Sequence, residues 1–279
     1  MTQHGRAFSD ISEAEYLASY DIRSYPCYAV TADVALFSML TRESDNYRKE
    51  RSKALSVLLI HRRAHPGRGK LALPGGFLRP DETVEACALR ELREETGLTP
   101  GALLPLGVYS AADRDPRGRV ISNAFLSAVP ERPFELHADS DADDADWYEI
   151  ALEPDGEDTL CLTLTGSAET ARAVLRPVSG ADGSMHMQVT ENDRLAFDHA
   201  AILGDAISLL RRRARSYELV FRFLPELFTL SDFQQAYEKL TGETVLTPNF
   251  RRKTADLVRE TEHFTSGTGH RPARLYTKR

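Results

Sequence analysis

The chain has few of the features that are typical of secreted, zinc-binding or membrane proteins. Its three cysteines, Cys27, Cys87 and Cys161, are odd in number and widely spaced, which fits neither a disulfide framework nor a zinc motif. No segment has the apolar length of a membrane span, and the first twenty residues are too polar for a secretory signal. Internal repeats and low-complexity tracts are missing too. We therefore expect a cytoplasmic globular protein with reduced thiols and no membrane partner.

The composition that remains is that of an ordinary globular protein, 42% hydrophobic and 28% charged. A length of 279 residues predicts one or two domains. The net charge of −7 is unevenly distributed, because residues 197–279 carry 14 Lys and Arg against 10 Asp and Glu. That segment has a net charge of +4, which leaves −11 for residues 1–196. An acidic body with a basic tail indicates two modules, the second suited to a polyanion.

A loop followed by an acidic helix lies between Gly76 and Gly97. Glycine lets the loop approach a ligand closely, and Gly97 occupies the usual left-handed position at the helix end. At 3.6 residues per turn, Glu91, Glu94 and Glu95 fall within about 100° of one another. There they repel each other and oppose the helix macrodipole. Such an unfavourable cluster indicates a site for a hard divalent cation such as Mg²⁺.

The alternative for this helix is a solvated acidic face whose charge is balanced by Arg90 and Arg93. The spacing favours the metal site. From Gly76 to Leu98 the chain reads Gly-x5-Glu-x7-Arg-Glu-apolar-x-Glu-Glu-x-Gly-apolar, which resembles the signature box of the Nudix hydrolases at every specified position.

This resemblance implies an α/β/α sandwich that hydrolyses nucleoside diphosphates linked to another group, with Mg²⁺ or Mn²⁺. In such enzymes the cation polarises the diphosphate and activates a water molecule. By motif position, Glu94 and Glu95 are implied to be the central metal ligands, and the carbonyl of Gly76 a backbone ligand. Glu91 is implied to be a further ligand or the water-activating base. Arg90, helped by Glu82, is implied to orient the acidic residues by charge-assisted hydrogen bonds.

Apolar and alternating runs predict the strands of the sheet, at residues 28–40, 55–60, 103–109, 120–129, 147–148, 160–164, 172–178 and 185–190. The acidic run at residues 139–146 resembles a calcium-binding loop, but Asp144 replaces the turn glycine and Ile150 the last ligand. We interpret that run as a solvated loop.

Three arginines, Arg114, Arg117 and Arg119, lie on a turn between two predicted strands. They either hold the phosphates of the substrate, with Glu82 as a further substrate-binding residue, or are exposed at the tip of a hairpin. The sequence leaves both interpretations open.

The basic C-terminal segment has the outline of a winged helix-turn-helix. A helical pattern at residues 197–213 predicts a connecting helix or a dimer contact. Three short helical segments, at residues 217–224, residues 229–240 and from Thr247, then precede a hairpin over residues 259–276. The predicted recognition helix and hairpin tip carry the candidate DNA-binding residues, which are Asn249, Arg251, Arg252, Lys253, His270 and Arg271. The alternative is a small helical appendage used for oligomerisation.

Both halves together resemble the Nudix-related transcriptional regulators. The resemblance rests on the box and on Phe197-Asp198-His199-Ala200, Asn249-Phe-Arg-Arg-Lys and His270-Arg-Pro-Ala-Arg-Leu-Tyr. It implies an α+β chain, with an N-terminal extension at 1–24, a Nudix domain at 25–195, a connecting helix at 196–213 and a winged-helix domain at 214–279.

Regulators of this family are typically homodimeric repressors that bind double-stranded operator DNA and sense ADP-ribose or a related nucleotide. Their box is often degraded, whereas this one is complete. The sequence therefore predicts a nucleotide-responsive repressor that also retains the residues for hydrolysis. The alternative is a metal-dependent diphosphatase whose C-terminal module serves assembly only.

Overall fold

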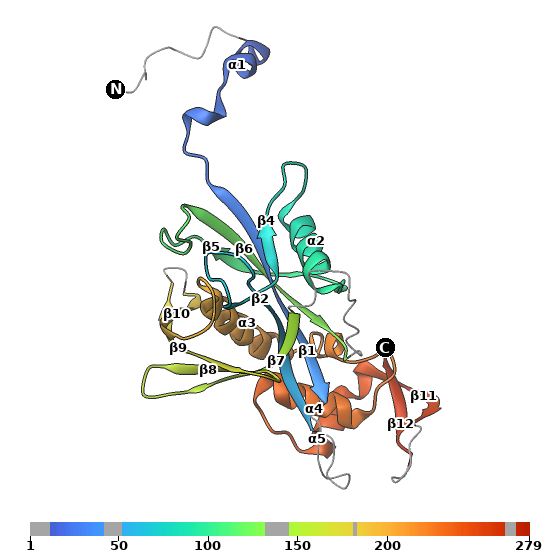
Figure 1. Cartoon of the computed structure of the whole chain (residues 1–279). Helices are drawn as coiled ribbons and strands as arrows, with labels where there is room; N and C mark the ends of the chain where they lie inside the picture. Colours follow the sequence, from blue (N-terminus) through green and yellow to red (C-terminus); the bar gives the residue numbers. More distant parts are fainter. Residues whose placement is uncertain (1–11, 42–51, 132–144, 181–182, 266–271) are drawn as a thin grey trace.

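The computed structural model describes residues 12–41, 52–131, 145–180, 183–265 and 272–279 (Figure 1). A large mixed sheet carries helices on both faces and is followed by a small helical domain with a two-stranded sheet. An N-terminal arm, formed by α1 (Glu13–Ser19) and the 3-10 helix η1 (Ile22–Ser24), projects from one end of the body in Figure 1. Within the described ranges, no helix is long and apolar enough to cross a membrane.

In the described part of the chain, the strands of the large sheet are β1 (Ala29–Thr41), β2 (Lys53–His61), β3 (Leu71–Ala72), β4 (Gly75–Phe77), β5 (Leu104–Tyr109), β6 (Val120–Val129), β7 (Ala145–Pro154), β8 (Leu160–Thr165), β9 (Thr170–Ser179) and β10 (Met185–Asn192). The apolar runs predicted from the sequence form eight of them, and the short strands β3 and β4 were not predicted. The strand order is β10-β9-β8-β7-β2-β1-β6-β5, with β3 beside β2 and β4 beside β1. Strands β1 and β6 run parallel, and the other pairs run antiparallel. Strand β1 is buried along most of its length because helices cover both faces of the sheet.

Helix α2 (Val84–Thr96) covers one face of the sheet. Its buried side, with Cys87, Ala88 and Leu92, packs into an apolar cluster with Val34 and Leu36 of β1. This packing fixes the rotation of α2 about its axis, so that the three glutamates of the box lie beside its buried side and not on it.

Helix α3 (His199–Ala214) covers the opposite face and contacts β9, β10, β1 and β5. A Cβ atom at Gly204 would lie 2.6 Å from Cδ1 of Leu175, so the helix approaches the sheet more closely than a larger residue would allow. The predicted connecting helix is therefore a core element. A dimer contact made by this helix does not fit its burial.

The C-terminal domain consists of the 3-10 helix η3 (Val220–Phe223), α4 (Leu230–Thr241), α5 (Thr247–Thr254), η4 (Ala255–Leu257), β11 (Val258–Phe264) and β12 (Arg274–Lys278). Its centre is an aromatic cluster in which Phe233 and Phe250 lie 5.1 Å apart, and Tyr217 and Tyr237 lie 4.9 Å apart between ring centroids. These rings belong to the same apolar cluster as α3 and the sheet. The two parts of the chain therefore share one continuous core.

Two local predictions in this domain were wrong in detail. Only residues 220–223 of the predicted helix at 217–224 are helical, because Tyr217 has a φ of 65° and Pro225 restricts the residue before it. The sequence also predicted that the Thr247 hydroxyl caps the next helix, but Thr247 is the first residue of α5, and its N-cap, Leu246, makes no side-chain capping bond. The acidic run at 139–146 lies mostly outside the described residues, and its last member, Asp146, belongs to β7.

Candidate active site and nucleic-acid interface

Helix α2, which carries the acidic residues, is capped at both ends. The side chain of Thr83 accepts a hydrogen bond from the backbone N–H of Ala86 at 3.2 Å, and Gly97 ends the helix with a φ of 70°. Glu91, Glu94 and Glu95 lie together on one side of its last two turns, where Glu94 is exposed and the other two are half-buried. With the segment that follows β2, they line a cavity of about 350 Å³.

Arg90 holds the acidic residues in place from the same helix. Its guanidinium donates to both carboxylate oxygens of Glu82, at 2.9 and 2.5 Å. It also donates to Glu91 at 2.6 Å, to Glu94 at 3.2 Å and to the carbonyl of Phe77 at 3.3 Å. Its hydrogen bond to Glu82 lowers the pKa of Glu82 to about 2. Glu82 therefore lies behind Arg90 as a positioning residue, instead of facing the cavity where substrate contact was predicted.

The glycine pair before α2 lets the backbone approach two of the carboxylates. The N–H of Gly75 donates to Oε2 of Glu95 at 2.8 Å. A Cβ atom at Gly76 would lie 2.4 Å from Cδ of Glu91, so only glycine leaves room for that carboxylate. Burial, together with the nearby charges of Glu91 and Asp33, raises the pKa of Glu95 to about 8.

These residues fit a hard divalent cation in donor type and position. Three carboxylates line one cavity, Gly76 lies against Glu91, and oxygen ligands are those that Mg²⁺ prefers. A bound cation would stabilise the charged form of Glu95 most, because this carboxylate is buried beside two other acids. Within the described ranges, no three acidic, His or Cys side chains converge into a finished ligand set. The contacts of Arg90 with Glu91 and Glu94 account for the separation.

A basic and aromatic wall lies beside the acidic cluster. Its residues Arg117 and Phe197 were named from the sequence, and Arg62 was missed. Arg62, which lines the same cavity as the glutamates, lies with its guanidinium carbon 4.8 Å from the ring centre of Phe197. The guanidinium of Arg117 lies 5.8 Å from the same ring and 5.0 Å from that of Phe77. Phe197 has a φ of 50°, a strained value for a bulky residue and one found mainly at functional sites.

The three arginines of the turn between β5 and β6 have different environments. Arg114 is buried, and its guanidinium forms a bidentate pair with Asp198 at 2.9 and 2.7 Å. The predicted exposed tip does not fit this burial, whereas contact of Arg114 with a phosphate stays a prediction. Arg117 pairs with Asp115 but is partly exposed, and Arg119 lies over the ring of Tyr28. Of the three, Arg117 is the one that lies against the rings of Phe77 and Phe197.

A polar cluster beneath this wall ties together distant parts of the chain. Asp33 of β1 accepts a hydrogen bond from Ser122 of β6 and lies 3.7 Å from Arg114. His199, at the start of α3, accepts the backbone N–H of Leu73 on Nδ1 at 2.9 Å. Burial lowers the pKa of His199, so its neutral form is favoured there. The Phe-Asp-His-Ala run was the sequence signal for this cluster.

A second cavity, of about 810 Å³, opens beside Arg114 and Phe197, between β5, β10 and α3. Its wall includes Asp205, which accepts hydrogen bonds from the Tyr109 hydroxyl at 2.8 Å and from the N–H of Met187 at 2.7 Å. Burial raises the pKa of Asp205. Phe197 therefore stands between a small acidic cavity and a larger mixed one, an arrangement with room for a charged diphosphate and an attached organic group.

The recognition helix α5 packs through Phe250 and Thr254, which are buried. The side chains between and before them, Asn249, Arg251, Arg252 and Lys253, are exposed. This places four polar or basic groups on the solvent face of a helix held by the aromatic core. The other two candidate DNA-binding residues, His270 and Arg271, lie outside the described residues.

A layered sheet with a glycine loop, an acidic helix and an appended winged helix defines a Nudix domain joined to a DNA-binding module. Residues 46–158 match the family model of the NUDIX domain, and residues 220–277 match that of the NrtR DNA-binding winged helix domain. The chain belongs to the Nudix family, and its C-terminal part is an NrtR-type winged helix.

Three relatives illustrate the likeness. An "ADPR responsive transcriptional repressor NtrR" of Acinetobacter baylyi is 29% identical over 269 residues, which span 95% of this chain and 88% of the relative. An "ADP-ribose pyrophosphatase" of Methanocaldococcus jannaschii is 42% identical over 130 residues, 47% of this chain and 69% of the relative. The crystal structure of Shewanella oneidensis NrtR complexed with a 27mer DNA superposes with a TM-score of 0.60 at 26% identity, covering 90% of this chain and 93% of that one.

Proposed function

We propose that this protein is a transcriptional repressor that binds double-stranded operator DNA and responds to ADP-ribose or a related nucleoside diphosphate derivative. The Nudix domain with its cleft and the winged helix with its exposed basic recognition helix share one continuous core, and this observation carries the proposal. The Acinetobacter baylyi relative, named as an ADPR responsive repressor, is similar along nearly the whole chain.

The cleft supports a diphosphate ligand through its charges. Glu91, Glu94 and Glu95 provide oxygen donors for Mg²⁺ or Mn²⁺, and a bound cation would polarise the diphosphate and activate water. Arg62 lines the same cavity as the glutamates, and Arg117 lies over the ring of Phe197 that Arg62 also contacts, so both supply positive charge for the phosphate oxygens. Arg90 keeps Glu91 and Glu94 oriented from behind.

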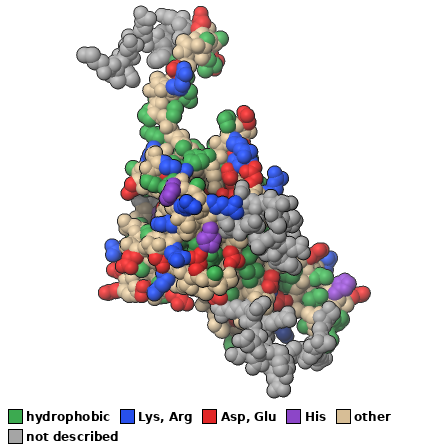
Figure 2. Space-filling model, viewed as in Figure 1, with side chains coloured by type: hydrophobic (Ala, Val, Ile, Leu, Met, Phe, Trp, Pro, Cys, Tyr) green, Lys and Arg blue, Asp and Glu red, His purple; other side chains and the backbone are tan. Residues whose placement is uncertain are grey.

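The N-terminal arm supports a homodimer. Helix α1 has no buried residue, and Leu17 and Ile22 are 62% and 68% exposed. Figure 2 shows hydrophobic side chains at the surface of this arm. A seven-residue helix is too short to be stable alone in water, so we propose that the arm packs on a second copy of the chain. Such a dimer presents two α5 helices to two operator half-sites. The nucleotide weakens DNA binding if it binds more tightly to a dimer arrangement in which the spacing of the two α5 helices does not match that of the half-sites.

Gel-shift titration of full-length protein with operator DNA tests the regulator. The substitutions Arg251→Gln, Arg252→Gln and Lys253→Gln together should weaken binding at least about tenfold and flatten its salt dependence by roughly 0.9 per lost phosphate contact. The matched control carries Arg176→Gln, Arg212→Gln and Arg213→Gln, which remove the same charge from exposed positions outside α5. Equal DNA affinity of the two triple variants would mean that α5 is not the reading helix.

Hydrolysis is the second candidate function, and the complete acidic box favours it. We expect Mg²⁺- or Mn²⁺-dependent cleavage of ADP-ribose to AMP and ribose 5-phosphate, and its loss in Glu94→Gln and in Glu95→Gln. If both variants retain full turnover, the carboxylates have been assigned wrongly. A variant that loses cleavage but still releases DNA in response to ADP-ribose would separate sensing from catalysis.

A further inference from the structure

The cavity of about 810 Å³ between β5, β10 and α3 combines an apolar surface with one buried acid. Figure 1 shows α3 beside β10 at this part of the body. The large apolar side chains of its lining are Val108, Met187, Val189 and Phe197. Val108 is 63% exposed, so its apolar surface at the edge of the sheet is left uncovered. The volume falls within the roughly 300 to 1,000 Å³ of small-molecule pockets.

Hydrogen-bond acceptors gather at one place on the wall of this cavity. Asp205, which is 8% exposed, accepts from the Tyr109 hydroxyl at 2.8 Å and from the N–H of Met187 at 2.7 Å, one on each carboxylate oxygen. These two donors oppose the rise in the pKa of Asp205 that burial causes. The hydroxyl of Tyr109 has given its proton to Asp205, so its oxygen is also left to accept. This part of the wall therefore suits a ligand group that carries N–H or O–H donors.

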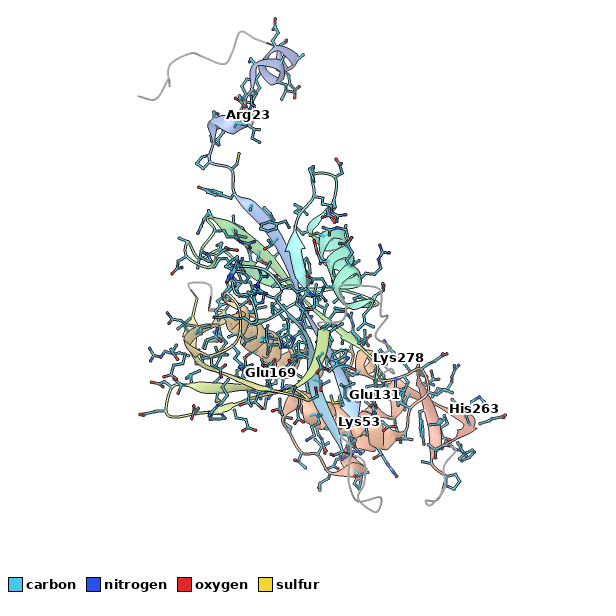
Figure 3. All side chains as sticks on the ribbon, viewed as in Figure 1. Arg23, Lys53, Glu131, Glu169, His263 and Lys278 are labelled. Atoms are coloured by element: carbon cyan, nitrogen blue, oxygen red, sulfur yellow. The ribbon has the colours of Figure 1, made fainter. Side chains whose placement is uncertain are left out.

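The larger cavity adjoins the acidic cavity at the side chain of Arg62. Arg62 lines the acidic cavity, and its Nε donates at 2.8 Å to the carbonyl of Pro66, which lines the larger one. Phe197, on the wall of the larger cavity, has its ring centre 4.8 Å from the guanidinium carbon of Arg62. Glu169, on the turn between β8 and β9 (Figure 3), pairs with Arg194 and so anchors the segment that leads to Phe197. A diphosphate bound at Arg62 therefore has the larger cavity beside it.

We propose that this cavity receives the nucleoside end of the diphosphate ligand, and that Asp205 selects a base with an amino group, such as adenine, over a base with a keto group. The inference rests on the nucleotide ligand proposed for the Nudix cleft. An amino N–H donates to Asp205, whereas a keto oxygen places two acceptors against each other and leaves the buried carboxylate without a ligand donor. A ribose hydroxyl donates as well, but the flat face of a base covers Val108 and Phe197, which a hydrated sugar does not.

Calorimetric titration of the full-length protein in EDTA tests this assignment, because binding is then measured without metal-dependent cleavage. The two probes are ADP-ribose and inosine diphosphate ribose, whose base carries a keto group where adenine has its amino group. We expect ADP-ribose to bind at least about tenfold more tightly. Equal affinities overturn the base assignment and leave the proposed function standing. Failure of both probes to bind overturns the proposed ligand of the cleft, and this inference with it.

The variant Asp205→Asn should reduce the preference for ADP-ribose to less than about threefold, since an amide offers a donor to a keto group and an acceptor to an amino group. The control Asp155→Asn removes the same charge from an exposed turn outside the cavity and should keep the wild-type preference. Thermal unfolding of both variants is measured beside the titrations. An undiminished preference in folded Asp205→Asn overturns the role of this carboxylate. The wild-type comparison of the two probes needs no variant, so it decides the base assignment even if Asp205→Asn does not fold.

Discussion

Replacing Gly76 with alanine should damage catalysis far more than folding. The new Cβ would lie 2.4 Å from Cδ and Oε1 of Glu91, whereas ordinary contact begins at 3.4 Å. The carboxylate must therefore retreat by about 1 Å, and a misplacement of that size costs about 100-fold in rate, or about 2.7 kcal/mol. The backbone of Gly76 does not have a positive φ, so alanine adds no backbone strain.

The assay is Mg²⁺-dependent turnover of ADP-ribose, measured beside the thermal unfolding midpoint. Gly101→Ala is the matched control, because a Cβ atom there meets nothing within 4 Å. We expect the control to keep wild-type turnover and both variants to unfold within a few degrees of wild type. If Gly76→Ala turns over within about threefold of wild type, the close approach of Glu91 to this glycine has no role in the reaction.

Three further predictions concern the pH response, the cavity wall and the arm. Burial lowers the pKa of His199 below its ordinary 6.5, so the stability contributed by the neutral imidazole is full above that pH and is lost as the pH falls through the folded-state value. Chemical denaturation at about pH 7.5 and pH 5.5 should therefore show a smaller loss of unfolding free energy in His199→Gln than in wild type. Equal losses would assign the acid sensitivity to another group. Phe197→Leu should weaken ADP-ribose binding about tenfold by calorimetry, because the ring that orders Arg62 and Arg117 is gone, and wild-type affinity would remove Phe197 from the site. Deleting residues 1–24 should convert the proposed dimer to monomer in analytical ultracentrifugation, and a dimer that persists at micromolar concentration would exclude the arm as the contact.

Much of the acidic half of the site could be predicted from sequence, because it depends on local geometry. The spacing of Glu91, Glu94 and Glu95 fixes their common face once the segment is a helix, and Gly97 fixes where that helix ends. Arg90 lies one turn away from Glu94, so its contact with Glu94 follows from the same periodicity.

The basic half could not be predicted in this way, because its members come from separate elements. Arg62 follows β2, Arg117 lies between β5 and β6, and Phe197 precedes α3. No short-range spacing connects them. The burial of Arg114 was missed for the same reason, since its partner Asp198 lies 84 residues away.

The sequence by itself determined the elements with a strong local period: the strands of the sheet, the capped acidic helix and the amphipathic helix α4. The tertiary structure alone decided that α3 is a core helix shared by both domains, and that Phe197 lines one cavity while contacting Arg62 of the other. Local patterns fix which face of an element is apolar because backbone periodicity is the same in every protein. Which distant face packs against it depends on the packing of the whole core, and a single sequence read locally does not contain that information.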